Sequence, residues 1–112
     1  MKRPITTERR AMLEQDLRVL IPIAKRLARH AGRGHAITVG NVKRHLKNRP
    51  TILLSSTAPR YRAVVFGQVM KRAGLARASD KKVTLPRDLG GNDVFQWTLP
   101  EWAPRKQTRR VA

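Results

Sequence analysis

The residues that commonly carry out catalysis are sparse in this chain and lie far apart along it. Its 7 carboxylates are scattered, and the closest two, Glu14 and Asp16, fall on different sides of a helix, where salt bridges to surface arginines explain them. Its 3 histidines lack the spacing of metal ligands, and there is no cysteine to supply a thiolate. We therefore expect no enzyme activity, no metal, no cofactor and no small-molecule substrate.

Two short polar motifs also lack the surroundings of a chemical site. Ser55, Ser56 and Thr57 precede a predicted helix, where their hydroxyls suit capping better than nucleophilic attack. The Gly90–Gly91 pair has neither the strand-to-helix passage nor the Lys-Ser/Thr of a phosphate-binding loop. The sequence therefore points to binding and not to catalysis.

The chain is rich in positively charged residues. It has 25 basic and 7 acidic residues, and the formal net charge of +18 repels itself unless DNA, RNA or an anionic membrane surface neutralises it. Arginine outnumbers lysine about two to one, which favours geometric contacts to phosphates or bases. No apolar run approaches the roughly 20 residues that span a bilayer, and no signal segment follows the basic start. We expect an intracellular protein, nucleoid-associated in a bacterium or archaeon.

One predicted helix, residues 58–73, is the best candidate for a binding surface. Thr57 or Ala58 can cap it, Pro59 suits its first turn, and Gly74 ends it, with Leu75 folding back on its last turn. Read with a helical period, its core side collects Val65, Phe66, Val69, Met70 and Ala73. The opposite side, here called the reading face, collects Arg60, Tyr61, Val64, Gln68, Lys71 and Arg72, with Gly67 removing bulk near its middle.

A longer helix is predicted near the start of the chain, over residues 7–31. Its apolar residues recur in helical register, and Pro22 should either kink it or separate two helices. The wide apolar stripe could serve a homodimer or lie on a membrane, but a small domain needs it for its core. We expect core packing for most of the stripe, with a homodimer through this helix as a possible further use.

A short strand and a second helix follow. Residues 35–38 can form an edge strand, and Thr38 then caps a helix for which Ile37 and Val42 form a hydrophobic staple. The connector 48–56 carries three apolar residues that we expect to be tucked against the core: Ile52, Leu53 and Leu54.

The period changes from helical to alternating after residue 76, which predicts a two-stranded hairpin. Residues 82–85 form its first strand, and Phe95, Trp97 and Leu99 alternate along its second. Phe95 and Trp97 could stack on bases, but their alternation favours core packing. The chain is thus divided into a basic arm (1–5), a domain (6–99) and a basic tail (100–112) that Trp102 could pin.

The order long helix, short strand, helix, helix, hairpin resembles the winged helix-turn-helix superfamily. The phrase VMKRAGLARAS, ahead of two strands, is similar to that family's passage from recognition helix into wing. The resemblance implies an α+β, mainly α, domain of three or four helices with a C-terminal two-stranded wing. It also implies that helix 58–73 enters the major groove of DNA while the wing touches the backbone. The connector 48–56 is longer than the family's usual turn.

The resemblance assigns roles to individual side chains. The reading face becomes the base-reading surface, on which Arg can pair with guanine, Gln with adenine, and Val64 can touch a thymine methyl. Tyr61 could stack on a base or bond to a backbone. The phosphate contacts would come from the second helix, the wing and the tail: Lys43, Arg44, Lys47, Lys81, Lys82, Arg87, Arg105, Lys106, Arg109 and Arg110.

Three functions remain open at this point. The first is a DNA-binding transcriptional regulator or architectural protein, for which nucleic acid, DNA before RNA, is the partner. The second is a structural RNA-binding protein of a ribonucleoprotein particle such as a ribosome, recognising shape and phosphates. The third is a protein-protein interaction module, which would seldom need so much charge.

Overall fold

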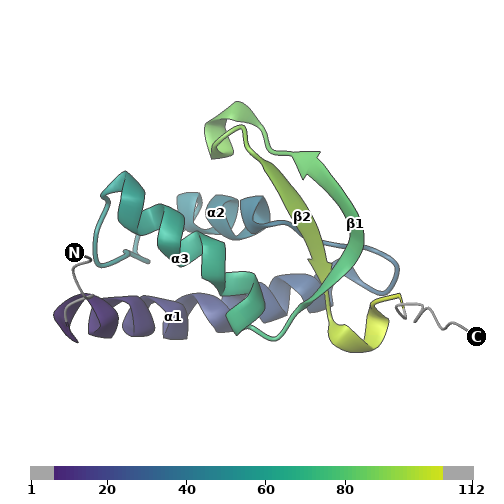
Figure 1. Ribbon diagram of the computed structural model, residues 1–112, viewed down its shortest axis with the longest axis horizontal. Helices are drawn as coiled ribbons and strands as arrows, with labels where there is room; N and C mark the ends of the chain where they lie inside the picture. The colour runs from purple at the N-terminus through teal and green to yellow at the C-terminus, as the bar shows by residue number, and fades with distance from the viewer. Residues whose placement is uncertain (1–6, 105–112) are drawn as a thin grey trace, which may run out of the picture.

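Three helices and a two-stranded antiparallel sheet make up the part of the chain described here, residues 7–104 of a computed structural model. The helices are α1 (Thr7–Ala31), α2 (Val39–Lys47) and α3 (Pro59–Arg72), and the strands are β1 (Ala76–Thr84) and β2 (Asp93–Thr98). Two short 3-10 turns are η1 (Arg87–Leu89) and η2 (Pro100–Trp102). The predicted α+β class is confirmed. Figure 1 shows α1 along the base of the molecule, with α2, α3 and the hairpin above it.

The first helix is continuous, so of the two alternatives predicted at Pro22, a kink or a separation into two helices, the separation is wrong. Pro22 is exposed, and its missing N–H removes one hydrogen bond of the helix. Leu17 and Leu20 before it and Ala24 and Ala28 after it are buried, and this packing holds both halves in one helix. The stripe is thus used within the chain, and a homodimer through α1 stays a prediction.

The second helix begins as its sequence predicts. The Thr38 hydroxyl accepts a 3.1 Å bond from the Gly40 N–H, and the Asn41 side chain accepts a 2.9 Å bond from the Thr38 N–H. Together they form a capping box in which Asn41 replaces the usual Glu or Gln. Ile37 and Val42, the predicted staple, are both buried.

The third helix also has predicted ends. Pro59 occupies its first position after Ala58. At its other end Gly74 has a φ of 77°, and the Leu75 N–H donates a 3.2 Å bond to the Met70 carbonyl. The Gly74 N–H donates a 3.0 Å bond to the Lys71 carbonyl, which completes the Schellman ending.

The hairpin is longer than expected, because β1 starts at Ala76 and not at residue 82. Its register pairs Ala76 with Thr98 and Thr84 with Asp93, with an irregularity between Arg77 and Lys82. The predicted edge strand is reduced to one bridge, in which Ile37 and Trp97 exchange bonds of 2.9 and 2.7 Å. This bridge ties the segment before α2 to the free side of β2.

All three helices and the hairpin contribute to one core. Its largest fully buried side chains are Leu17, Leu20, Val42, Val65 and Val69. Leu54 and Trp102 pack against it, so the ordered domain continues past residue 99 into η2. Leu53 does not, because it is 80 % exposed, and its predicted burial is wrong. The predicted arm, residues 1–5, and residues 105–112 of the predicted tail lie outside the described part.

Candidate nucleic-acid interface

The solvent side of α3 carries a cation toward each end and small side chains between them. Arg60 and Lys71 are exposed, and Val64 is 48 % exposed. Ala63 and Gly67 are exposed too, at the border of this face with the cleft described below, and a Cβ added at Gly67 would meet nothing within 4 Å. These five residues are called the outer face of α3 below. Another surface can approach the helix backbone closely here, between two long cationic side chains.

The rest of the predicted reading face turns toward α1. Arg72 forms an ion pair with Glu14, with 2.6 Å between nitrogen and oxygen, and donates a longer 3.4 Å bond to Gln68. The hydrogen bond from Arg72 lowers the pKa of Glu14, and Glu14 in turn raises the pKa of Arg72. Glu14 is therefore the arginine partner that its sequence predicts. Gln68 is half-buried and Arg72 stays exposed, so both border the outer face.

Tyr61 is half-buried and turned toward α1, so its predicted place on the solvent side is wrong. Its hydroxyl donates a hydrogen bond to Asp16, and its ring packs against the core. Burial, followed by the hydrogen bond and charge of Asp16, raises the pKa of Tyr61 to about 12. Its hydroxyl is committed to the protein and is not offered to a base.

Asp16 is also placed differently from its prediction as a surface salt-bridge partner. It is 4 % exposed, and its carboxylate accepts bonds of 3.0 and 3.2 Å from the Ser55 N–H and one of 2.9 Å from the Ser55 hydroxyl. A signal for this was present, because Asp16 lies three residues after Leu13 and four before Leu20, on the apolar stripe of its helix. Ser55 therefore donates hydrogen bonds to Asp16 of α1, which differs from the helix-capping role that its sequence position predicts.

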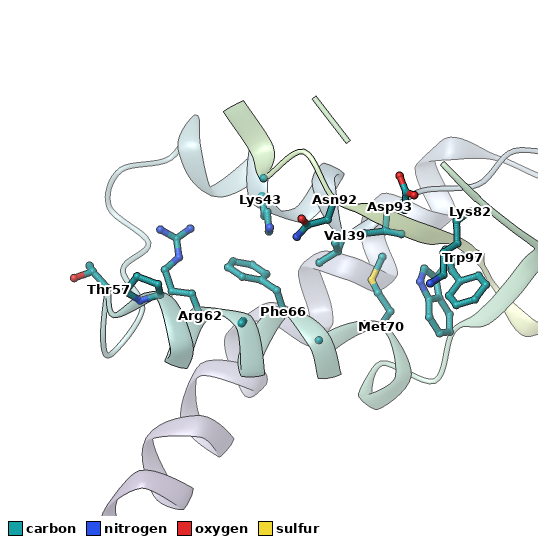
Figure 2. Close-up of a pocket in the computed structure, with 16 residues that line it drawn as sticks. Val39, Lys43, Thr57, Arg62, Phe66, Met70, Lys82, Asn92, Asp93 and Trp97 are labelled. Carbon is teal, nitrogen blue, oxygen red and sulfur yellow. The ribbon is translucent and has the colours of Figure 1, made fainter. Parts of the chain in front are cut away.

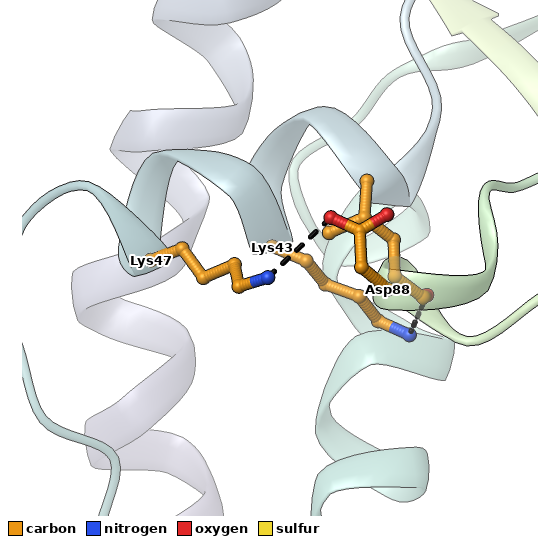
Figure 3. A network of polar contacts seen from close by, with 4 residues as sticks. Lys43, Lys47 and Asp88 are labelled. Carbon is orange, nitrogen blue, oxygen red and sulfur yellow. Dashed lines mark hydrogen bonds and ion pairs between the residues drawn. The ribbon is translucent and has the colours of Figure 1, made fainter.

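The tip of the hairpin is docked on α2, and this changes the role of two predicted phosphate contacts. Lys43 donates a 3.2 Å bond to the Leu89 carbonyl, and Lys47 pairs with Asp88 at 3.4 Å (Figure 3). Burial, and then the charge of Arg62, lowers the pKa of Lys43. Neither lysine projects freely from α2 as the prediction required.

The other predicted phosphate contacts divide into two groups. Four are exposed on α2, β1 and η1, namely Arg44, Lys81, Lys82 and Arg87. The remaining four lie outside the described residues, namely Arg105, Lys106, Arg109 and Arg110.

A cleft of about 680 Å³ separates α3 from α2 and the hairpin. Figure 2 shows Arg62, Phe66 and Lys43 at one end, Trp97 and Lys82 at the other, and Val39, Asn92 and Met70 between them. Sequence reasoning missed this site, because Arg62 had no assigned role. Phe66 lies in the core and Trp97 packs against it, as predicted, and both also line the cleft. Its cations come from three separate elements, so no local pattern could have shown it.

No family model matches this chain, and searches among curated proteins and solved structures found no match either. Within residues 7–104, no cluster of three or more histidines and carboxylates could hold a metal ion. In the same residues, every helix is too short or too polar to cross a membrane. The absence of enzyme activity stays a prediction.

Proposed function

We propose that this protein binds double-stranded DNA as a winged-helix domain, in a transcriptional or architectural role, with the outer face of α3 in the major groove. The observation that carries the proposal is the outer face itself, where exposed Arg60 and Lys71 flank the small surface of Ala63 and Gly67. The element order supports the winged-helix part of the proposal. So does the bridge between Ile37 and Trp97, which joins the segment before α2 to the hairpin.

The chemistry of this face suits a major groove. The groove is about 12 Å wide and admits a helix, whose backbone can come closest where side chains are small. Arg60 can donate two bonds to guanine, Lys71 can bond to guanine or phosphate, and Val64 can touch a thymine methyl. Arg44 and Arg87, both exposed, would contact phosphates beside the groove.

The test is selection from random duplex DNA in the presence of a structured RNA competitor, followed by titration of two variants. We expect a duplex preference that Arg60→Ala relaxes, with a loss of affinity of roughly 5- to 100-fold for one bidentate base contact. Arg29→Ala removes the same charge from the exposed end of α1 and is the matched control. Equal losses for the two variants on every duplex would contradict groove reading.

One observation favours RNA as the second candidate. The solvent side of α1 carries exposed cations along most of its length: Arg10, Arg18, Lys25, Arg26 and Arg29. Exposed cations on several elements of a small domain suit a folded RNA that surrounds it. In that case the RNA competitor would abolish duplex binding, and Arg29→Ala would weaken RNA binding as much as Arg60→Ala.

A further inference from the structure

The cleft between α3 and the hairpin combines cations with aromatic rings in a way that the outer face does not. The Lys43 ammonium and the Arg62 guanidinium lie 5.3 and 5.5 Å from the centre of the Phe66 ring. At the other end, Lys82 lies 4.9 Å from the centre of the Phe95 ring. Each end thus places positive charge beside an aromatic surface.

The end formed by Lys43 and Arg62 is suited to an anion. The two like charges lie close to one ring, and within the described residues neither forms an ion pair with a carboxylate. Lys43 uses one of its three N–H donors on the Leu89 carbonyl and has two left for an anion. Asp93 lines the cleft, but its carboxylate accepts a 2.6 Å bond from the Thr84 hydroxyl, away from this end. An anion placed between Lys43 and Arg62 would relieve their mutual repulsion.

The middle of the cleft is suited to a flat apolar group with a polar edge. Val39 and Met70 form its walls, Trp97 is half-buried at its far side, and the Asn92 amide reaches into it from the hairpin (Figure 2). An amide can both donate to and accept from the edge of a base. The volume lies within the roughly 300–1,000 Å³ of small-ligand sites, so it admits a single nucleotide but no duplex.

We propose that this cleft holds one unpaired nucleotide of the nucleic acid that the protein binds, with its base in the apolar middle of the cleft beside Trp97. One neighbouring phosphate lies at Lys43 and Arg62, and the next lies at Lys82. A cleft with a cation at each end and an apolar middle fits a nucleic-acid strand with a phosphate on each side of the bound base. A free mononucleotide would use only one of the two cationic ends. The inference rests on the proposed nucleic-acid binding and adds a structural preference to it, for duplexes that contain an unpaired position.

The test compares an intact duplex, the same duplex with one unpaired nucleotide, and a third in which that nucleotide is abasic. Base stacking on aromatic side chains should make the full-length protein prefer the unpaired nucleotide over the intact duplex by roughly 5- to 100-fold, and the abasic strand should lose this preference. Equal affinity for all three would overturn the cleft proposal while leaving duplex binding intact. Binding to none of them would overturn the proposed function as well.

Two exposed arginines of the same helix provide matched variants. Arg62→Ala, at the cleft, should reduce the ratio of affinities for the unpaired and intact duplexes toward one. Arg60→Ala, on the outer face, should weaken both duplexes and leave the ratio unchanged. The same ratio in both variants would overturn the assignment to the cleft.

Tryptophan fluorescence locates the base independently of affinity. The chain has 2 tryptophans, and Trp102→Phe leaves Trp97 as the sole emitter. We expect the emission of Trp97 to be quenched by the duplex with an unpaired base and not by the abasic one. Equal quenching by both would place the base elsewhere and overturn the proposal.

Discussion

Asp16 joins three segments of the chain through one carboxylate. It lies on α1, it accepts bonds from Ser55 of the connector, and it accepts another from Tyr61 in the first turns of α3. A buried carboxylate is stable only when hydrogen bonds replace its lost hydration, and here three donors do so. This contact sets how the start of α3 lies on α1, and therefore which residues of α3 face outward.

Removing the Asp16 carboxylate should destabilise the fold. Asp16→Ala removes the charged acceptor of three partly buried hydrogen bonds from Ser55 and Tyr61, so we expect the free energy of unfolding to fall by about 3 kcal/mol in urea denaturation. Tyr61→Phe removes one donor and should cost about 1 kcal/mol. Gln15→Ala, at an exposed position of the same helix, is the control and should leave the urea midpoint unchanged. An Asp16→Ala protein as stable as this control would contradict the role of the carboxylate.

Tyr61 is the single tyrosine of the chain, so tyrosinate absorbance reports its ionisation alone. Its pKa is raised to about 12 in the folded protein, while an unfolded tyrosine titrates near about 10. The folded state therefore keeps a proton that the unfolded state loses, and stability falls as the pH rises between these values. We expect a midpoint near 12 in buffer and near about 10 in urea. Equal midpoints would show that the hydroxyl is solvated in the folded state.

At the scale of elements, α2 and the hairpin form one unit. Leu85 and Leu89 are buried beside Gly40, where a Cβ would lie only 2.6 Å from the nearer leucine. The polar bonds of Lys43 and Lys47 to the hairpin lie next to this contact. A hairpin held in this way keeps Asn92 and Trp97 fixed opposite α3, which is what a preformed cleft needs.

Two glycine substitutions distinguish the effect of the contact between α2 and the hairpin on stability from the effect of helix propensity. Gly67→Ala, at an open position of α3, should raise the free energy of unfolding by roughly 0.5–1 kcal/mol, because alanine is the better helix former. Gly40→Ala gains the same propensity but must displace Leu85, so we expect no increase. Thermal or urea unfolding of the two variants measures the difference. An equal gain at both positions would mean that the hairpin does not press on α2.

Local signals explain which elements the sequence predicts well. The ends of α2 and α3 depend on Thr38, Pro59 and Gly74, which act within a few residues of themselves, and all three act as expected. In the first half of β1 only Ala76 and Ala78 alternate with polar residues, and Asp80 and Lys81 end this short alternation, so the segment becomes a strand through pairing with β2. Packing also explains why α1 continues through Pro22, since buried residues on both sides of the proline hold the helix together.

The candidate site follows the same rule. Arg60, Val64 and Lys71 are predicted correctly as exposed because they lie opposite the apolar side of α3, where helical periodicity alone decides. Tyr61 lies at the edge of that face, and its direction depends on where α1 runs. The contacts of Lys43 depend on the position of the hairpin tip, because its partner Leu89 lies 46 residues later in the chain.

At the scale of the whole molecule, the excess charge has few internal partners. Lys47 pairs with Asp88 and Arg72 with Glu14, but the full chain has 25 basic residues and only 7 carboxylates to pair with them. Repulsion among the remaining cations destabilises the folded state and is weakened by salt. A bound polyanion removes the same repulsion, and salt competes with it.

Salt should therefore act in opposite directions on stability and on binding. Raising sodium chloride from about 50 to 200 mM should raise the unfolding midpoint of the free protein, because screening reaches its exposed cations. Over the same range, duplex affinity should fall by roughly 10²- to 10³-fold if about five phosphates are contacted, with a slope of about −0.9 per contact.

Arg87→Ala at the hairpin tip should reduce that slope by about one contact, whereas Val64→Ala should weaken binding and leave the slope unchanged. A salt-independent affinity would mean that the excess charge acts on something other than a nucleic-acid backbone.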